Sequence, residues 1–421
     1  MINRIGLRLP EPEVPAVAQF AELFWSRTPE EDLASRDVDD DAGATIDSWR
    51  KFVQRDAPTT QIWVDNPQRS RDGWHSSHTV VRVMVPDMPF VVDSVLIALS
   101  HEGLITHHLS NVVFAVQRSA NGAVERVDAP SGTAPGELFI YAEIDRVEVQ
   151  EVAALQDRLQ QTLADLRAIV GDFAPIKDQL ALIVDELRRA PPPLPADEIA
   201  ENIAFLEWLN ANNFTFLGYR EFDYRDGIMR QAGKSLGTLR VRTPASERRL
   251  AEQPAHTQAF LLDKVGLAFS KSGTKSRVHR PAYPDYVGVK RFNDAGEVIG
   301  ERGFLGLYTS RVYMEHPENI PVVRRKVEHV ISRSNLDPTG FDGKVLAQVL
   351  ATYPRDELFE IDEEQLFANA MAITYIHERR RTRVFTRFDR YGLFVNCLVY
   401  MPRDLFNTQS RTRVQELLNA T

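Results

Sequence analysis

The sequence contains one cysteine, Cys397, and no long apolar run. A single cysteine excludes an intrachain disulfide and a zinc site built from thiolate pairs. No stretch approaches the roughly 18 apolar residues that a membrane helix needs. The first residues also lack the apolar segment of a signal peptide. These absences predict a cytoplasmic, reducing setting and no membrane partner.

Motifs that bind nucleotides and metals are missing too. No two glycines are separated by one residue, so the G-x-G-x-x-G dinucleotide fingerprint is absent. Gly233-Lys234-Ser235 has Ile228 at the position where a P-loop requires glycine. H-E-x-x-H and C-x-x-C are absent as well. The sequence therefore predicts no catalytic, cofactor-binding or metal-binding residues in this chain.

The acidic run from Asp37 to Asp41 resembles a cation-binding loop. It fails the EF-hand pattern, because Ala42 and Ser48 stand where that loop requires Gly and Glu. We therefore expect a solvated loop between amphipathic helices at 14–34 and 44–55.

Composition is that of an ordinary globular protein, with 43% hydrophobic and 26% charged residues. A chain of 421 residues is long enough for roughly two to four domains. The formal net charge of −9 argues against binding to nucleic acid or to an anionic membrane. A nucleic-acid site using the basic stretches 271–291 and 377–383 is kept as an alternative.

The first half of the chain has the element order of a ferredoxin-like module. Strands are predicted at 79–85, 109–118 and 137–145, with a helix beginning near Pro89 and a long helix beginning near Glu148. The module lacks an evident closing strand, and the short strand predicted at 61–64 is a candidate for that place.

Arg188 to Pro195, RRAPPPLP, is the clearest linker, and a helix at 196–211 follows it. Strands dominate from Phe214 to Tyr308, including segments 236–241 and 259–271. The last part predicts helices at 320–334, 344–352 and 362–380, a weak strand at 355–361, a hairpin and a final helix. This part again predicts β-α-β-β-α without a closing strand, which suggests a piece of a longer protein.

The stretch from Ala268 to Tyr308 combines a charged loop with a hairpin. Its loop interleaves prolines and tyrosines with basic residues, namely Lys271, Lys275, Arg277, His279 and Arg280. Proline reduces the conformational entropy that the loop loses on folding, and tyrosine can pack against the protein. We therefore expect an ordered loop. These five residues are our candidates for an interdomain contact or an anion site.

Several long segments carry a family resemblance. They are MPFVVDSV, LAFSKSGTKSRVHRPAYPDYVGVKRF, TYPRDELF and ERRRTRVFTRFDRYGLFVNCLVYMPRD. Together they resemble the N-terminal region of the large bacterial NAD-specific glutamate dehydrogenases. The resemblance implies a multi-domain α+β fold, in which ferredoxin-like (ACT-like) βαββαβ modules flank a mostly antiparallel PAS-like α+β domain. The expected parts are an N-terminal helical segment at 1–58, a first ACT-like module with a helical extension at 59–190, the PAS-like domain at 196–312, and a helical connection with a truncated second ACT-like module at 318–421.

The resemblance also implies a function. The chain would be a regulatory and oligomerisation region of a homo-oligomeric enzyme that deaminates L-glutamate to 2-oxoglutarate and ammonium while reducing NAD. Its partner would be the C-terminal catalytic region of the same polypeptide, which would bind the NAD, with no cofactor in this chain. A stand-alone amino-acid-sensing module is the alternative.

An amino-acid effector is a further implied partner. In ACT modules effectors bind where the first strand meets the first helix, which here is Asp87, Met88, Pro89 and Phe90. Effector-binding modules have glycine after the proline, so that a ligand can approach the backbone and the helix N-terminus. Because Phe90 occupies that position, a packing role competes with a ligand role.

Overall fold

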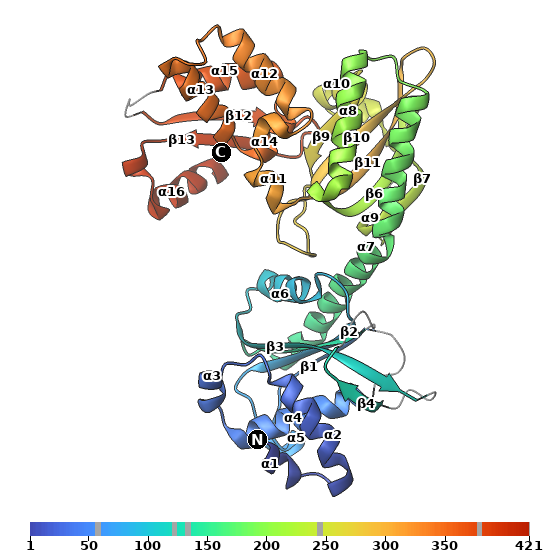
Figure 1. The fold of residues 1–421 in the computed structure, drawn as a ribbon, viewed down its shortest axis with the longest axis vertical. Coiled ribbons are helices and arrows are strands. Elements are labelled where there is room, and N and C mark those ends of the chain that lie inside the picture. Colours follow the sequence, from blue (N-terminus) through green and yellow to red (C-terminus); the bar gives the residue numbers. More distant parts are fainter. Residues whose placement is uncertain (55–59, 120–123, 131–135, 242–246, 377–380, 421) are drawn as a thin grey trace. The chain divides into compact units, whose positions relative to one another are not determined.

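The structure is a computed structural model that describes residues 1–54, 60–119, 124–130, 136–241, 247–376 and 381–420 (Figure 1). These residues form two compact units, which are described separately. The first comprises Met1–Val170 with Ser276–Pro281, and the second comprises Gly171–Lys275 with Ala282–Thr421. No helix within the described ranges has the length and apolar character needed to cross a membrane.

The first unit contains a five-stranded antiparallel sheet in the order β1-β2-β5-β3-β4. Its strands are β1 (Gln61–Asp65), β2 (Thr79–Pro86), β3 (Thr106–Arg118), β4 (Val124–Asp128) and β5 (Glu137–Ile144). β1 lies antiparallel beside β2, with Val64 opposite Val81. The strand predicted at 61–64 therefore does fill the place of the closing strand. β4, which the sequence analysis did not predict, pairs with the end of β3.

The helices of this unit are α1 (Ile2–Gly6), α2 (Val14–Phe24), α3 (Glu30–Ala34), α4 (Val38–Val53), α5 (Arg69–Asp72), α6 (Val91–His101) and the start of α7 (Val149–Arg189). The loop predicted at Asp37 to Asp41 is wrong, because Asp37 caps α4. Its carboxylate accepts the backbone N–H groups of Asp39 and Asp40 at 2.8 and 3.0 Å. Acidic residues in a first turn also favour a helix, since they complement the helix dipole.

Aromatic side chains hold the N-terminal helices against the sheet. Phe20 of α2 stacks on Phe114 of β3 at 5.1 Å between ring centroids, and Phe52 of α4 meets the same ring edge-on at 5.0 Å. All three rings are fully buried. Figure 1 shows α6 on the opposite face of the sheet, so both faces of this sheet are covered.

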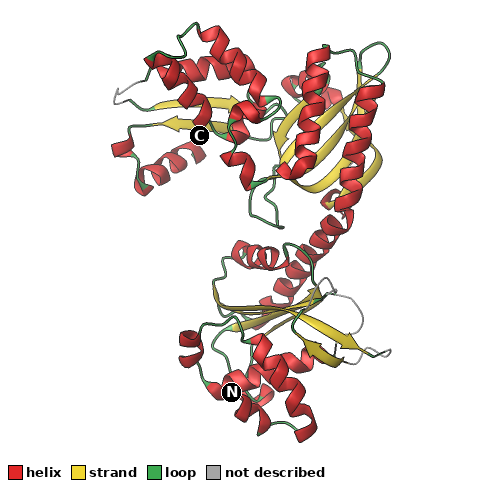
Figure 2. Ribbon diagram, in the orientation of Figure 1, coloured by secondary structure: helices red, strands yellow, loops and turns green. Residues whose placement is uncertain are grey.

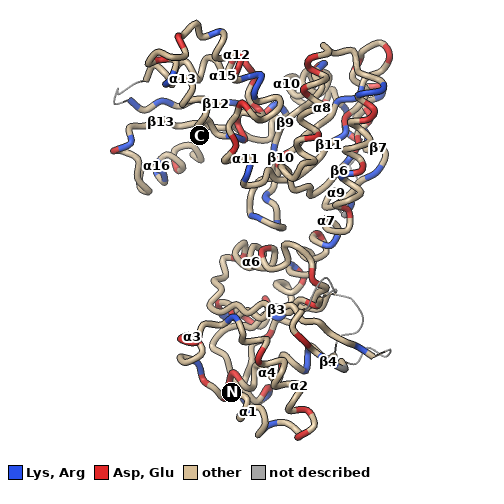
Figure 3. Tube along the Cα trace, in the orientation of Figure 1, with Lys and Arg blue, Asp and Glu red and all other residues tan. Residues whose placement is uncertain are grey.

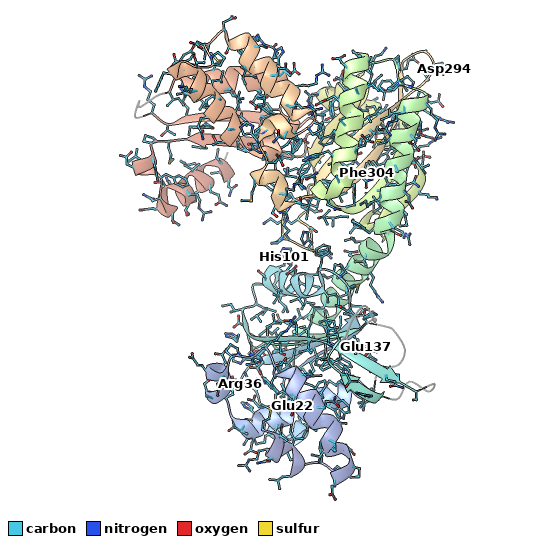
Figure 4. The ribbon with its side chains drawn as sticks, in the orientation of Figure 1. Glu22, Arg36, His101, Glu137, Asp294 and Phe304 are labelled. Carbon is cyan, nitrogen blue, oxygen red and sulfur yellow. The ribbon has the colours of Figure 1, made fainter. Side chains whose placement is uncertain are left out.

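The second unit is built on a six-stranded antiparallel sheet in the order β8-β7-β6-β11-β10-β9 (Figure 2). Its strands are β6 (Phe214–Arg225), β7 (Ile228–Gly237), β8 (Arg248–Arg249), β9 (Leu267–Lys271), β10 (Asp285–Phe292) and β11 (Val298–Tyr308). The predicted hairpin is confirmed as β10 and β11. Gly296 takes a positive φ of 75° in its turn, and Asp294 marks that turn in Figure 4.

Of two segments predicted as strands, one is largely helical, and the other is a strand only in its last part. The segment 236–241 turns into α9 (Thr238–Val241), and the segment 259–271 contains the end of α10 (Ala255–Leu261) before β9. Their apolar residues are too closely spaced to separate a buried helix from a strand by periodicity alone.

One hydrophobic core joins this sheet to the helices around it. The second half of α7 and α8 (Ala196–Trp208) pack on the sheet face that carries Phe304, which Figure 4 labels. The same core continues into α12 (Val323–Ser334), α13 (Phe341–Thr352), α14 (Arg355–Glu360) and α15 (Glu363–Thr374). α11 (Ser310–Met314) connects β11 to these helices.

The strand predicted at 355–361 is wrong, because this segment forms α14. Pro354 precedes the helix, acidic Asp356 and Glu357 occupy its first turn, and Leu358 is fully buried. The chain then enters β12 (Arg383–Phe388), β13 (Val395–Tyr400) and α16 (Thr408–Asn419). The last part is therefore a helical bundle followed by a hairpin and a helix, and the second β-α-β-β-α prediction fails at its first strand.

Gly171 offers a test of the continuous 41-residue helix α7. It is exposed inside the helix, and a Cβ added there meets no atom within 4 Å. Gly171→Ala should therefore raise the free energy of unfolding by about 0.5–1 kcal/mol in denaturant titrations.

Gly73→Ala is the matched control. A Cβ there also meets no atom within 4 Å, but the residue has a φ of 75°, so alanine should lower stability by about 1 kcal/mol. Destabilisation by Gly171→Ala would contradict a continuous helix through this position.

Candidate functional site

The predicted effector loop, Asp87 to Phe90, connects β2 to α6 in the first unit. The Asp87 N–H donates to the Gly136 carbonyl at 2.8 Å, which fixes the start of the loop. Phe90 has a φ of 69°, the left-handed conformation that glycine adopts more easily. The Ser94 hydroxyl donates to the Phe90 carbonyl at 2.6 Å and holds this conformation.

His279 covers Phe90 within the first unit. Their ring centroids lie 4.2 Å apart, and the backbone N–H of His279 donates to the Ser94 hydroxyl at 3.4 Å. Burial lowers the pKa of His279, and the positive charge of Arg280 lowers it further. A neutral imidazole therefore packs on the phenyl ring. The structure thus brings Phe90 of the predicted effector loop into contact with His279 of the predicted contact residues.

The other predicted contact residues divide between the two units, with Lys271 and Lys275 in the second unit and Arg277 and Arg280 in the first. Lys271 of β9 pairs with Asp285 and, at 3.1 Å, with Asp356 of α14. The Lys275 ammonium lies 5.7 Å from the centre of the Tyr283 ring. Of the remaining two, Arg277 is exposed and Arg280 is half-buried. The charge of Lys271 is therefore already matched by protein carboxylates.

Lys271 belongs to a set of buried and half-buried charges in the second unit, which we call the ionic seam. It comprises Lys271, Asp285, Lys290, Glu301, Asp356, Glu357, Glu360 and Arg387. These residues come from β9, β10, β11, α14 and β12, so the seam joins the sheet to the helices and to the last hairpin. Figure 3 shows Lys and Arg positions alongside Asp and Glu positions along these elements.

The centre of the seam is the pair of Lys290 and Glu301. Their side chains are 0% and 2% exposed, and the ammonium lies 2.7 Å from the carboxylate. Glu301 also accepts the hydroxyls of Tyr286 at 2.5 Å and Tyr391 at 3.1 Å. Lys290 donates to the Leu261 carbonyl at 3.1 Å. A buried carboxylate is tolerated when it is paired and bonded in this way.

A second buried cation connects β12 to α14. The Arg387 guanidinium donates to Glu357 at 2.5 Å and also to Glu360, and Asn396 of β13 adds a bond to Glu357 at 2.6 Å. Burial raises the pKa of Glu360 to about 7, although Arg387 opposes that change. The hairpin is thus held to the helical bundle by charge-assisted hydrogen bonds.

Asp285 is a second carboxyl group of the seam with a raised pKa. Burial raises its pKa to about 6, against the opposing effect of Lys271. Neighbouring Asp389 is also buried, and it accepts the Ser270 hydroxyl at 2.7 Å and the Leu393 N–H at 3.0 Å. These bonds join β9 to β10 and to the last hairpin, so the arrangement is suited to holding elements together.

Sequence analysis predicted only Lys271 among the residues of the seam. The charges lie inside strands and helices at irregular spacing, and no local pattern identifies their partners. Across the part of the chain that the structure describes, no group of three or more His, Cys, Asp or Glu side chains could hold a metal ion. Residues 377–380 of the basic run in the nucleic-acid alternative lie outside the described residues.

Three family models match the chain. They are the glutamate dehydrogenase ACT1 domain at residues 20–159, helical motif 1 at 320–379 and the ACT2 domain at 383–421. The NAD-specific glutamate dehydrogenase from Halomonas elongata is 40% identical over 99% of this chain. The protein of the same name from Pseudomonas aeruginosa is 40% identical over 98% of the chain. The enzyme of the same name from Mycobacterium tuberculosis is 30% identical over 78% of the chain.

The chain belongs to the NAD-specific glutamate dehydrogenase family. It spans about a quarter of the curated relatives from Halomonas and Pseudomonas, 26% of each, and corresponds to their N-terminal region. The resemblance in the sequence is thereby confirmed, as are the ACT domains expected near the two ends of the chain. The ACT2 match begins at the β12–β13 hairpin, which agrees with the helical assignment of α14.

Glu301→Gln tests the centre of the ionic seam in the second unit. The substitution leaves the Lys290 ammonium buried without a carboxylate, so we expect a loss of about 3–5 kcal/mol in the free energy of unfolding. Adding Lys290→Met should recover part of that loss, because the uncompensated charge is then removed.

Glu297→Gln, in the exposed turn beside it, serves as the control. It should change stability by about 0.5 kcal/mol or less. Equal effects of the two glutamine variants in urea titrations would rule out the seam as a stabilising centre.

Glu360 gives the seam a defined pH dependence. Its folded-state pKa of about 7 lies above the ordinary value of 4.5, so the folded protein binds this proton more tightly than the unfolded chain. The resulting stabilisation is fully present below pH 4.5 and is lost as the pH rises through 7, up to about 3 kcal/mol.

Glu360→Gln should flatten that decline in unfolding free energy measured across the same pH window. Glu252→Gln, an exposed substitution in the same unit, should leave the decline unchanged. If the Glu360→Gln curve runs parallel to that of the unsubstituted protein, this carboxyl group does not titrate as described.

Proposed function

We propose that this chain is the N-terminal regulatory and assembly region of an NAD-dependent glutamate dehydrogenase. The observation that carries the proposal is the alignment of 99% of the chain with 26% of a protein of that name. The parent reaction would convert L-glutamate, NAD⁺ and water to 2-oxoglutarate, ammonium and NADH, by hydride transfer from the α-carbon.

The proposal divides the work between two parts of one polypeptide. The dinucleotide fingerprint is absent from this sequence, so NAD binding and hydride transfer are assigned to the C-terminal catalytic region. The present region would contribute no catalytic residue and no cofactor contact. Its ACT modules and buried connections are suited to assembling a homo-oligomer and to passing a regulatory signal.

The finer fold assignment belongs to the same proposal. We assign the β1-β2-β5-β3-β4 sheet with α6 and α7 to a ferredoxin-like ACT module, supported by the position of β1 beside β2. We assign the six-stranded antiparallel sheet of the second unit to a PAS-like domain, supported by its strand order. The four-part domain division at 1–58, 59–190, 196–312 and 318–421 also stays a prediction.

Two surfaces remain candidates for regulation. An amino-acid effector at Asp87 to Phe90 would have to displace the His279 ring from Phe90, which makes packing the better-supported role of Phe90. The exposed Arg277 is instead available to another domain or subunit of the full enzyme. Coupling of this kind amounts to about 1–3 kcal/mol between the two states involved.

The stand-alone sensing module is the less favoured alternative. It leaves unexplained why the whole chain aligns inside proteins about four times its length. The nucleic-acid alternative is not favoured either, because Lys271 is already paired with carboxylates.

The full-length enzyme carrying Arg277→Ala and Arg280→Ala tests this division of labour. We expect altered subunit assembly in light scattering or an altered response to amino acids, with glutamate-dependent NADH production at saturating substrate changed by less than about twofold. The reason is that these side chains belong to a contact surface rather than to the reacting centre.

The isolated chain is the control for catalysis and should produce no NADH from glutamate and NAD⁺. Turnover by the isolated chain would contradict the proposal. So would a double variant that loses turnover while its assembly and its response to amino acids stay normal.

A further inference from the structure

A cavity of about 320 Å³ lies inside the second unit, apart from the predicted effector loop. Its walls come from α8, α10, β9, α12, the α14–α15 connection and the turn of the last hairpin. Apolar residues form much of the lining, among them Phe260, Leu267, Phe269, Phe359 and Ile361. This is the size and character of a small-molecule site, which needs a few polar groups to orient a ligand.

Most charged groups around the cavity are already paired. Glu201 binds Arg324, Arg325 binds Asp197, Glu360 binds Arg387, Glu363 faces His329, and Asp362 caps α15. The Lys326 ammonium donates to the carbonyls of Leu358, Phe359 and Ile361 at 2.7–2.9 Å. Three acceptors match the three N–H bonds of a charged ammonium. These groups maintain the wall and are not free to bind a ligand.

Three lining residues have spare bonding capacity. Arg390 lies 5.1 Å above the Phe260 ring, and no carboxylate or other acceptor contacts its guanidinium among the described residues. Glu198 accepts the Gly266 N–H through one oxygen at 3.1 Å and has no cation partner in the described chain. Asn202 is 8% exposed as a whole residue, and its side-chain amide forms no hydrogen bond with any described residue.

This distribution defines the chemistry of a ligand. Buried or half-buried polar groups without partners cost free energy, so a molecule that satisfies them is favoured. Arg390 requires an anion and presents a planar fork suited to a carboxylate. Glu198 requires a cation, and the Asn202 amide can both donate and accept. The apolar walls require an aliphatic or aromatic body.

We propose that this cavity binds a free amino acid, with its carboxylate on Arg390, its ammonium on Glu198 and its side chain against the apolar walls. The site lies where β9, α12, α14 and the last hairpin meet, beside Glu360 of the ionic seam. A ligand there would contact β9, α14 and the turn of the last hairpin, which gives it a means to bias the packing of these elements.

The inference deepens the regulatory role proposed above and rests on it. It also places amino-acid recognition at a site other than the loop from Asp87 to Phe90. Failure of the two ideas can be told apart, because binding is measured on this chain and turnover on the full-length enzyme. If no amino acid binds in the cavity, the dehydrogenase proposal still holds, and the region then has an assembly role alone.

The test begins with thermal unfolding of this chain in the presence of each proteinogenic L-amino acid at millimolar concentration. At least one should raise the unfolding temperature in proportion to the logarithm of its concentration. Its N-acetyl derivative and its decarboxylated amine each lack one charge and should bind at least about tenfold more weakly in calorimetry. No stabilisation by any amino acid would overturn the inference.

Variants then locate the site. Arg390→Ala and Glu198→Gln should each weaken binding at least about tenfold while the ligand-free unfolding temperature shows that the variant is folded. Arg325→Ala is the matched control, since that residue lines the same cavity but is paired with Asp197. Unchanged affinity in both site variants, or a loss caused by Phe90→Gly instead, would assign the amino acid elsewhere and refute this site.

Discussion

The carboxylate of Glu301 is the point on which the packing of the second unit depends. A buried anion is tolerated only when a cation and hydrogen-bond donors surround it, and here they come from separate segments. Lys290 lies across the β10–β11 hairpin, Tyr286 belongs to the same strand as Lys290, and Tyr391 comes from the last hairpin. Moving any one of these segments leaves a charge or a hydroxyl unsatisfied. The requirement therefore fixes where the last hairpin meets the sheet.

The rest of the ionic seam extends this constraint to the helical bundle. Arg387 joins the last hairpin to α14, and Lys271 joins β9 to the same helix through Asp356. Apolar packing around the seam is non-directional and would accept small shifts, whereas hydrogen-bonded charges accept few arrangements. The seam is therefore suited to passing a signal between the sheet and the helical bundle. A small displacement of one segment changes several of its hydrogen bonds and ion pairs at once. The proposed amino-acid cavity adjoins the seam, while the predicted effector loop is part of the first unit.

The two candidate regulatory sites differ in how many of their polar groups lack a hydrogen-bond or ionic partner. At the loop from Asp87 to Phe90, the left-handed Phe90 is covered by His279, and the hydroxyl of Ser94 is already bonded. In the cavity, Arg390 and Glu198 retain bonding capacity of opposite sign. A ligand gains more where polar groups lack partners than where it must first displace a packed ring. The same reasoning makes Lys271, with two carboxylate partners, a poor anion site.

The sequence alone determined the family and the elements with strong local signals. The β10–β11 hairpin followed from its turn glycine, and the place of β1 followed from the incomplete module. Short segments such as 355–361 were mispredicted, since a few closely spaced apolar residues suit a buried helix as well as a strand.

Only the tertiary structure decided the partners of the buried charges and the lining of the cavity. Glu301 and Tyr391 are 90 residues apart in the chain, and nothing in the local pattern of either position specifies the other. Pairing at that distance is selected by the desolvation of both groups during folding, when the hydrophobic core brings their segments together. Local periodicity carries no information about that step.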